Sequence, residues 1–246
     1  MALSQHEAFP VGHMGSPWRL CAPGVRRVAL SCVHSPEEPV WGLPLHAEGR
    51  CGIMSGMTEV SSLTGRLLVA TPALADPNFD RAVVLLLDHD EEGSLGVVLN
   101  RPTPVDVGDI LEGWADLAGE PGVVFQGGPV SLDSALGVAV IPGDATGTSA
   151  PLGWRRVHGA IGLVDLEAPP ELLASALGSL RIFAGYAGWG PGQLEDELVE
   201  GAWYVVESEP GDVSSPSPER LWREVLRRQR SELAMVATYP DDPSLN

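Results

Sequence analysis

Short apolar runs separated by turn residues follow the first quarter of the chain and continue through most of the rest. The runs at 65–72, 81–90 and 94–102 predict strands, and the second run is apolar on both faces, as in a central strand. The connection between the second and third runs is too short to contain a crossover helix. We therefore predict that 81–88 and 95–100 form an antiparallel hairpin.

A helix is predicted over 103–119, with Thr103 as its N-cap and Pro104 at its first position. The glycine-rich stretch "GYAGWGPGQLEDEL" at 185–198 predicts a strand-to-helix turn followed by a short acidic helix, which Gly201 ends. The remaining apolar runs predict strands at 122–130, 135–142, 157–165, 180–188 and 202–208, and helices at 169–178 and 217–229.

These elements predict one compact domain over residues 57–246. Its expected fold class is α/β or α+β, with a mixed β-sheet that contains the antiparallel hairpin and is flanked by helices. Residues 1–56 show neither helical nor alternating periodicity, so we interpret them as a disordered or non-native N-terminal extension.

The formal net charge is −18, and all 15 basic residues are arginines. The absence of lysine excludes a Schiff-base lysine, a phosphate-loop lysine and a serine–lysine dyad. Its acidity opposes direct nucleic-acid binding, which depends on cations that neutralise phosphates. Neither an apolar stretch of roughly 18 residues nor a signal peptide is recognisable, so we expect a cytoplasmic protein.

No familiar catalytic or cofactor-binding motif is present, and we predict no catalytic residue, metal or cofactor. His89 stands among acidic residues at 88–92, which we interpret as a charged hairpin turn rather than a metal site. A serine triad could assemble only in space, from His89 or His158 with one of several serines. In the glycine-rich stretch, Pro191 and the acidic residues that follow it disfavour a phosphate site.

Five arginines gather at 220–230, which would suit a nucleic-acid or partner-facing helix. Because the chain is acidic overall, we favour a solvated helix whose cations suit its own C-terminal dipole and can also bind acidic surface elsewhere on the chain.

Four segments together resemble the YqgE/AlgH family of bacterial proteins: "GRLLVATPALADPNFDRAVVLLLDHDEEGSLGVVLNRP", "VFQGGPV", "RIFAGYAGWGPGQLEDEL" and "GAWYVV". The resemblance covers residues 62–246. It implies a compact single-domain α/β fold with a mixed sheet and no established catalytic residues. One branch of this family is described as a transcriptional regulator through a link to alginate production.

The residues that match the family include polar side chains and glycines for which two accounts compete. In the first, they form a structural clasp in which Arg101 pairs with Glu197, while Asn100 or Gln193 bonds loop backbone. In the second, the same groups line a small cleft for a ligand. We favour the clasp, because most such polar sets are structural. The candidate residues are Asn100, Arg101, Gly127, Gly128, Tyr186, Trp189, Gln193 and Glu197.

These observations predict a non-enzymatic binding or regulatory protein that acts through an unknown protein or small-ligand partner. Regulation of transcription would be indirect, because the charge is wrong for DNA and no helix-turn-helix pattern is present. The alternative is an enzyme, such as a hydrolase that uses Asn100, Arg101, Gln193 and Glu197.

Overall fold

The computed structural model describes residues 62–74, 76–143, 151–230 and 232–240, and the predicted extension at 1–56 lies outside them. The strands are β1 (Arg66–Ala70), β2 (Val83–Asp90), β3 (Gly93–Val98), β4 (Pro102–Asp106), β5 (Val123–Gln126), β6 (Val130–Val140), β7 (Trp154–His158), β8 (Ile161–Val164), β9 (Ser179–Trp189) and β10 (Trp203–Glu207). The helices are η1 (Val107–Asp109), η2 (Glu112–Leu117), α1 (Glu171–Ala174), α2 (Gln193–Val199), α3 (Pro210–Val213), η3 (Pro218–Arg220), α4 (Leu221–Arg227) and α5 (Leu233–Val236).

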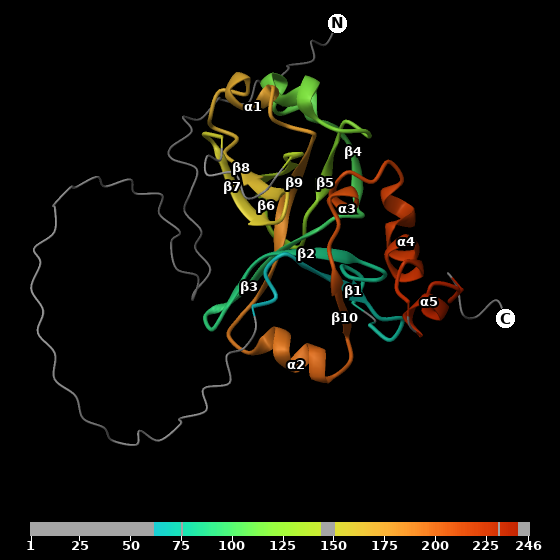
Figure 1. The fold of residues 1–246 in the computed structure, drawn as a ribbon. Coiled ribbons are helices and arrows are strands. Elements are labelled where there is room, and N and C mark those ends of the chain that lie inside the picture. Colours follow the sequence, from blue (N-terminus) through green and yellow to red (C-terminus); the bar gives the residue numbers. More distant parts are fainter. Residues whose placement is uncertain (1–61, 75, 144–150, 231, 241–246) are drawn as a thin grey trace, which may run out of the picture.

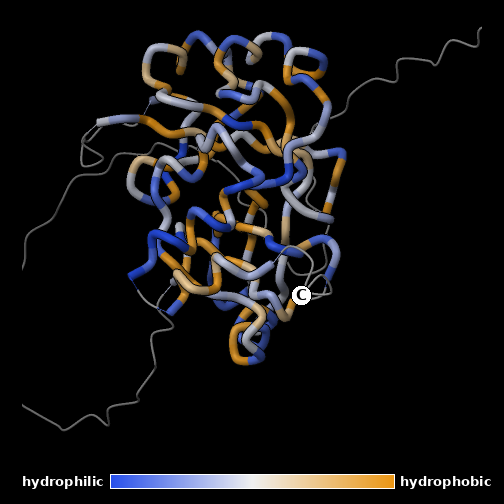
Figure 2. Tube along the Cα trace, turned by 90° about the vertical axis from the view of Figure 1, so that its right-hand side faces the viewer, coloured by the Kyte–Doolittle hydropathy of each residue, from blue (hydrophilic) through white to orange (hydrophobic). Residues whose placement is uncertain are grey.

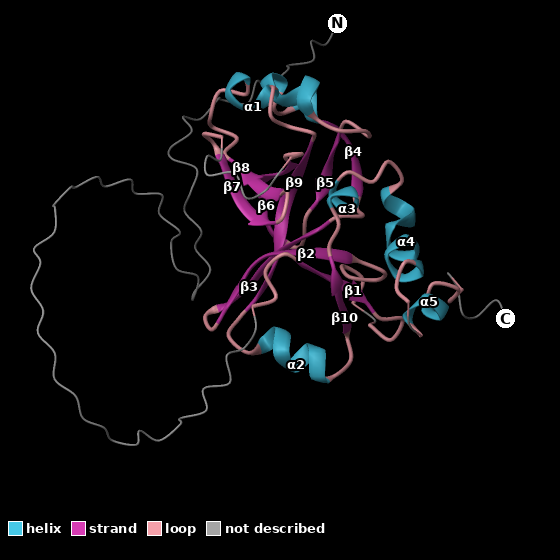
Figure 3. Cartoon of the chain, in the orientation of Figure 1, coloured by secondary structure: helices cyan, strands magenta, loops and turns pink. Residues whose placement is uncertain are grey.

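The strands form one 10-stranded sheet with the order β10-β1-β2-β3-β9-β6-β8-β7, and β5 joins it beside β9 and carries β4 (Figures 1 and 3). The neighbours along this path pair antiparallel, and β5 runs parallel to β9, so the sheet is mixed, as predicted. Repeated β-α-β units are missing from the described residues, and the helices are short. The fold is therefore a sheet-dominated α+β domain rather than an α/β domain.

The predicted hairpin is formed by β2 and β3, whose register pairs Val84 with Val98 and His89 with Ser94. β2 lies between β1 and β3, and its apolar residues are buried on both faces, as expected for a central strand. β1 pairs on its other side with β10, near the opposite end of the sequence.

The predicted helix over 103–119 is wrong. Its first part is the edge strand β4, in which Thr103 donates through its hydroxyl to the Val124 carbonyl instead of capping a helix. The residue before a proline avoids the helical region, so Pro104 forces Thr103 to be extended. The helical part is reduced to the short η1 and η2, with Trp114 buried but Ile110 58% exposed.

The strand predicted over 157–165 is two strands, β7 and β8, which pair antiparallel across a turn at Gly159. Gly159 has φ of +53°, a left-handed conformation that glycine adopts without strain. β7 begins at Trp154, before the start of the predicted strand.

The sheet curls, so that Gly65 just before β1 packs against His158 at the end of β7. The largest core cluster lies inside the curl and includes Phe125 and Phe183. Helix α4 covers this cluster with Trp222 and Val225. A second core lies between the β1–β2–β3 face and α2, and a third lies beneath η2 and α1. Hydrophobic and hydrophilic stretches alternate at short intervals along the trace, in keeping with these short elements (Figure 2).

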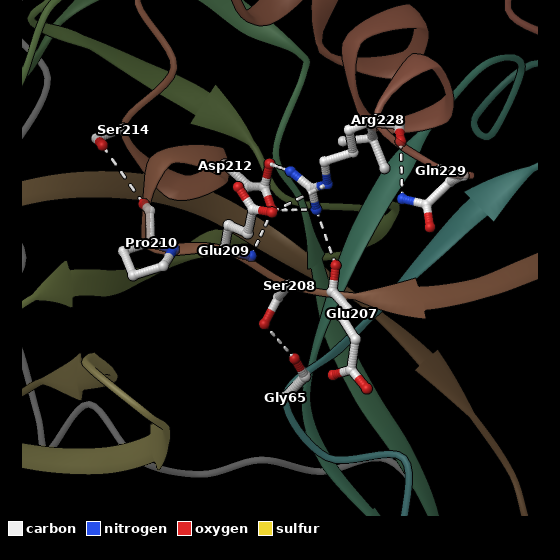
Figure 4. A network of polar contacts seen from close by, with 10 residues as sticks. Gly65, Glu207, Ser208, Glu209, Pro210, Asp212, Ser214, Arg228 and Gln229 are labelled. Carbon is white, nitrogen blue, oxygen red and sulfur yellow. Dashed lines mark hydrogen bonds and ion pairs between the residues drawn. The ribbon is translucent and has the colours of Figure 1, made fainter. Parts of the chain in front are cut away.

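The predicted C-terminal helix is confirmed as η3 followed by α4, with Ser217 at the N-cap, Pro218 in the first turn and an apolar stripe that is buried. Arg228 anchors it to acidic groups of the same chain, because its guanidinium bonds Asp212 and the Glu207 carbonyl (Figure 4). Burial lowers the pKa of Arg228, but the hydrogen bond and charge of Asp212, together with Glu209, raise it above its ordinary value.

Replacing Arg228 with methionine should lower the free energy of unfolding by about 2 kcal/mol, because the Asp212 carboxylate, 4% exposed, loses its cation. Chemical denaturation would measure the change. The matched control is Arg227→Met on the exposed side of the same helix, which should stay within about 0.5 kcal/mol of the wild type. Equal losses in the two variants would contradict the assigned role of the Arg228–Asp212 pair.

Candidate functional site

Asn100 and Arg101 hold the turn that leads into β2. Asn100 is buried; its Oδ1 accepts from the backbone N–H of Val83 at 3.0 Å, and its Nδ2 donates to the carbonyl of Arg81 at 2.9 Å. Both ends of this amide are therefore occupied by loop backbone. The half-buried Arg101 donates to the Asp80 carbonyl. Burial lowers the pKa of Arg101, and the charge of Asp80 offsets part of that shift.

Gly127 and Gly128 form a close backbone crossing with Gly185 and Tyr186. A Cβ on Gly127 would lie 2.3 Å from the Gly185 oxygen, and one on Gly128 would lie 2.2 Å from the Tyr186 carbonyl. Gly127 also donates to the Ala184 carbonyl at 2.8 Å, which joins β5 to β9. Gly127 does not have a positive φ, so glycine is needed there for the space it leaves.

Glu197 on α2 accepts from two buried tryptophans. Its Oε2 lies 3.0 Å from the indole nitrogen of Trp189 and 2.8 Å from that of Trp203, and its Oε1 accepts from Gln193 at 3.0 Å. The other end of the Gln193 amide accepts from the backbone of Gly190, which closes the glycine-rich turn. Phe79 stacks on one tryptophan and meets the other edge-on.

The structure divides the predicted polar residues into two separate groups, Asn100 with Arg101 and Gln193 with Glu197. Within the described part of the chain, Arg101 and Glu197 do not pair with each other, because their partners are Asp80 and the two tryptophans. Both groups instead hold the segment just before β2 in place, the first through Asp80 and the second through Phe79. Asn100, Arg101, Gln193 and Glu197 therefore do not form one hydrolytic constellation.

Two aromatic members of the second group, Phe79 and Trp203, were missed in the sequence. Trp203 could have been found, because a buried indole N–H needs an acceptor and Glu197 is a nearby acidic residue in the sequence. Phe79 gave no signal, since its loop is polar around it and its partners lie more than a hundred residues away.

His89 is buried beneath the hairpin turn, with its side chain 2% exposed. Its Nδ1 lies 2.8 Å from the Ser94 hydroxyl, and its Nε2 lies 3.6 Å from the Glu195 carboxylate on α2. Asp88 and Asp90 are exposed, as alternation predicts. Among the described residues, no three His, Cys, Asp or Glu side chains are grouped so as to hold a metal ion.

Arg181 is a buried cation that no sequence motif indicated. It lies on β9, 2% exposed, with its guanidinium 4.3 Å from the Phe125 ring centre. It donates to the carbonyls of Glu120 and Ser215, and burial lowers its pKa to about 10. These contacts tether two loops to the sheet, so Arg181 has a structural role.

Within the described residues, no helix is both long and apolar enough to cross a membrane.

The chain matches a family model described as AlgH-like over residues 67–234. A UPF0301 protein of Streptomyces avermitilis is 96% identical over 193 residues, which cover 78% of this chain and all of that relative. A UPF0301 protein of Thermobifida fusca is 50% identical over 194 residues, which cover 75% of this chain and 96% of that protein.

Two solved structures resemble the fold. A protein of Corynebacterium diphtheriae aligns with a TM-score of 0.67 and 32% identity, covering 72% of this chain and 92% of that one. The AlgH protein of Pseudomonas aeruginosa aligns with a TM-score of 0.53 and 28% identity, covering 75% of this chain and 98% of that one.

Proposed function

The chain belongs to the AlgH-like family, and from that premise we propose that it is a regulatory binding protein which acts through a protein or small-ligand partner. The observation that supports this role is the internal bonding of the polar residues that match the family. Asn100, Gln193 and Glu197 each use both polar side-chain atoms within the protein. Side chains committed in this way stabilise a surface and are poorly placed to perform catalysis.

Arg101 is the member of the set best suited to contact a partner. A guanidinium has five N–H donors, and Arg101 donates to one carbonyl among the described residues. Its side chain is half-buried and so partly fixed before binding. The remaining N–H groups of the planar guanidinium would donate charge-assisted hydrogen bonds to a carboxylate or phosphate group of the partner.

The test is isolation of the full chain from its native cells, followed by mass spectrometry of the intact complex and of released small molecules. We expect a ligand or protein that remains with the wild type and falls at least about tenfold in Arg101→Gln, which corresponds to the loss of one charged contact. Arg227→Gln is the control, because Arg227 is exposed on α4. Thermal unfolding must show that Arg101→Gln is folded. Equal retention by both variants, or no retained partner in the wild type, would contradict the proposal.

Indirect action in transcription makes a separate prediction about DNA. With a net charge of −18, the protein should not be retained on immobilised double-stranded DNA at about 50 mM salt, where phosphate contacts are strongest. The measurement is the elution position across a salt gradient, compared with a neutral matrix. Retention that decreases as salt increases would show direct binding and overturn the indirect role.

A further inference from the structure

The hydroxyl of Ser94 and the imidazole of His89 are positioned by the hairpin itself. The two residues are directly opposite each other in the β2–β3 register, which brings Ser94 Oγ to 2.8 Å from His89 Nδ1. A bulge between Leu86 and Asp88 shifts the end of β2, and His89 is then buried while Asp88 remains exposed. Ser94 is half-buried, so its side chain is less enclosed than the imidazole.

The carboxylate of Glu195 faces the other nitrogen of this imidazole. It lies 3.6 Å from Nε2, on the side of the ring away from Ser94. A negative charge there favours the tautomer with its proton on Nε2, and Nδ1 is left with a lone pair that accepts the Ser94 O–H. The three side chains therefore stand in the order of a nucleophile, a base and a group that orients the base.

We propose that Ser94 is a nucleophile activated by His89, and that it takes the acyl group of neutral or cationic esters. In this step, the bond between Ser94 Oγ and the acyl carbon forms as the hydroxyl proton passes to Nδ1. The ester C–O bond then breaks, and the departing alkoxide takes that proton from Nδ1 and leaves as an alcohol. The Glu195 carboxylate stabilises the transient imidazolium through its Nε2–H.

The class of ester follows from the charges around Ser94. Asp88 and Asp90 flank His89 and are exposed, Glu91 and Glu92 follow in the turn, and Glu195 is 41% exposed on the facing helix. These carboxylates repel an anionic substrate, whereas a neutral or cationic ester meets no such barrier. The inference goes beyond the proposed binding role, because it concerns one reactive side chain at a different end of the hairpin from Arg101.

The probe is 4-nitrophenyl acetate, with 4-nitrophenyl hydrogen succinate as the anionic comparison. The full chain is incubated with each ester, and peptide mass spectrometry locates and times the acyl adduct. We expect acylation of Ser94, about tenfold slower with the anionic ester, as expected for repulsion at a charged surface. Ser94→Ala should lose the adduct, whereas Ser134→Ala, which alters another half-buried strand serine, should keep it.

Two further variants separate activation from simple exposure of a serine. His89→Gln should slow acylation of Ser94 about 100-fold, the contribution expected of a general base. Glu195→Gln alters a partly exposed helix residue and should also slow the reaction, which keeps the test valid when His89→Gln does not fold. The proposal is overturned by a wild type that is not acylated at Ser94, or by folded variants at His89 or Glu195 that react at the wild-type rate.

Discussion

Replacing Gly127 with alanine is expected to prevent the domain from folding, or to lower its free energy of unfolding by about 4 kcal/mol or more. The added methyl carbon would lie 2.3 Å from the Gly185 carbonyl oxygen. That neighbour is backbone in a central strand, so it cannot move without breaking the hydrogen bond from Gly127 to Ala184. Soluble yield, circular dichroism and chemical denaturation would measure the effect.

The matched control is Gly122→Ala, which changes the residue immediately before β5. A Cβ there has no atom within 4 Å, and Gly122 does not have a positive φ. This variant should remain within about 0.5 kcal/mol of the wild type. If Gly127→Ala folds with wild-type stability, the backbone crossing is looser than described, and the glycines at 127 and 128 need another explanation.

Changing Glu197 to glutamine should cost about 2–3 kcal/mol of unfolding free energy, although it conserves the shape of the side chain. The carboxylate accepts from two indoles through one oxygen and from Gln193 through the other. A glutamine amide has only one oxygen, so one end of the new side chain would present N–H groups to existing donors. With its oxygen toward the indoles, the variant would lose the bond from Gln193 and would accept from both tryptophans through a neutral atom. In the opposite orientation, both tryptophan N–H groups would lose their acceptor.

Glu200→Gln is the control for this variant, because Glu200 is an exposed residue at the end of the same helix. It should have little effect on the midpoint of thermal unfolding. Fluorescence adds a local measurement, since Glu197→Gln should alter the environment of Trp189 and Trp203. A variant with the wild-type midpoint and the wild-type emission spectrum would show that the carboxylate does not support the aromatic cluster.

Most strands could be predicted because each is a short apolar run bounded by turn residues, and the hairpin followed from its brief connection. The error at 103–119 shows the limit of this reasoning. Apolar spacing there resembles a helix, but Pro104 and the internal glycines at 108 and 113 weaken it, and pairing with β5 determines the outcome. Pairing of this kind joins segments that are distant in the sequence, so it produces no local sequence pattern from which it could be predicted.

The residues of the candidate site could be selected from the sequence, but their partners could not. The four-residue spacing of Gln193 and Glu197 places them on one face of a helix, and their side chains are hydrogen-bonded to each other on α2. The partner expected for Glu197 was Arg101, because the two side chains carry opposite charges. The actual donors are neutral indoles, because α2 lies across the face of the sheet where Trp189 and Trp203 are buried. Helix placement of this kind depends on the whole sheet.

The order of the strands along the chain also affects how the protein folds while it is being synthesised. β9 bridges the two halves of the sheet, and β1 finds one of its two partners only in β10. A nascent chain that has exposed β1 through β8 therefore holds open strand edges and uncovered apolar faces. We expect it to rely on chaperones until the last fifth of the sequence is released, and to fold slowly because its central contacts span long loops.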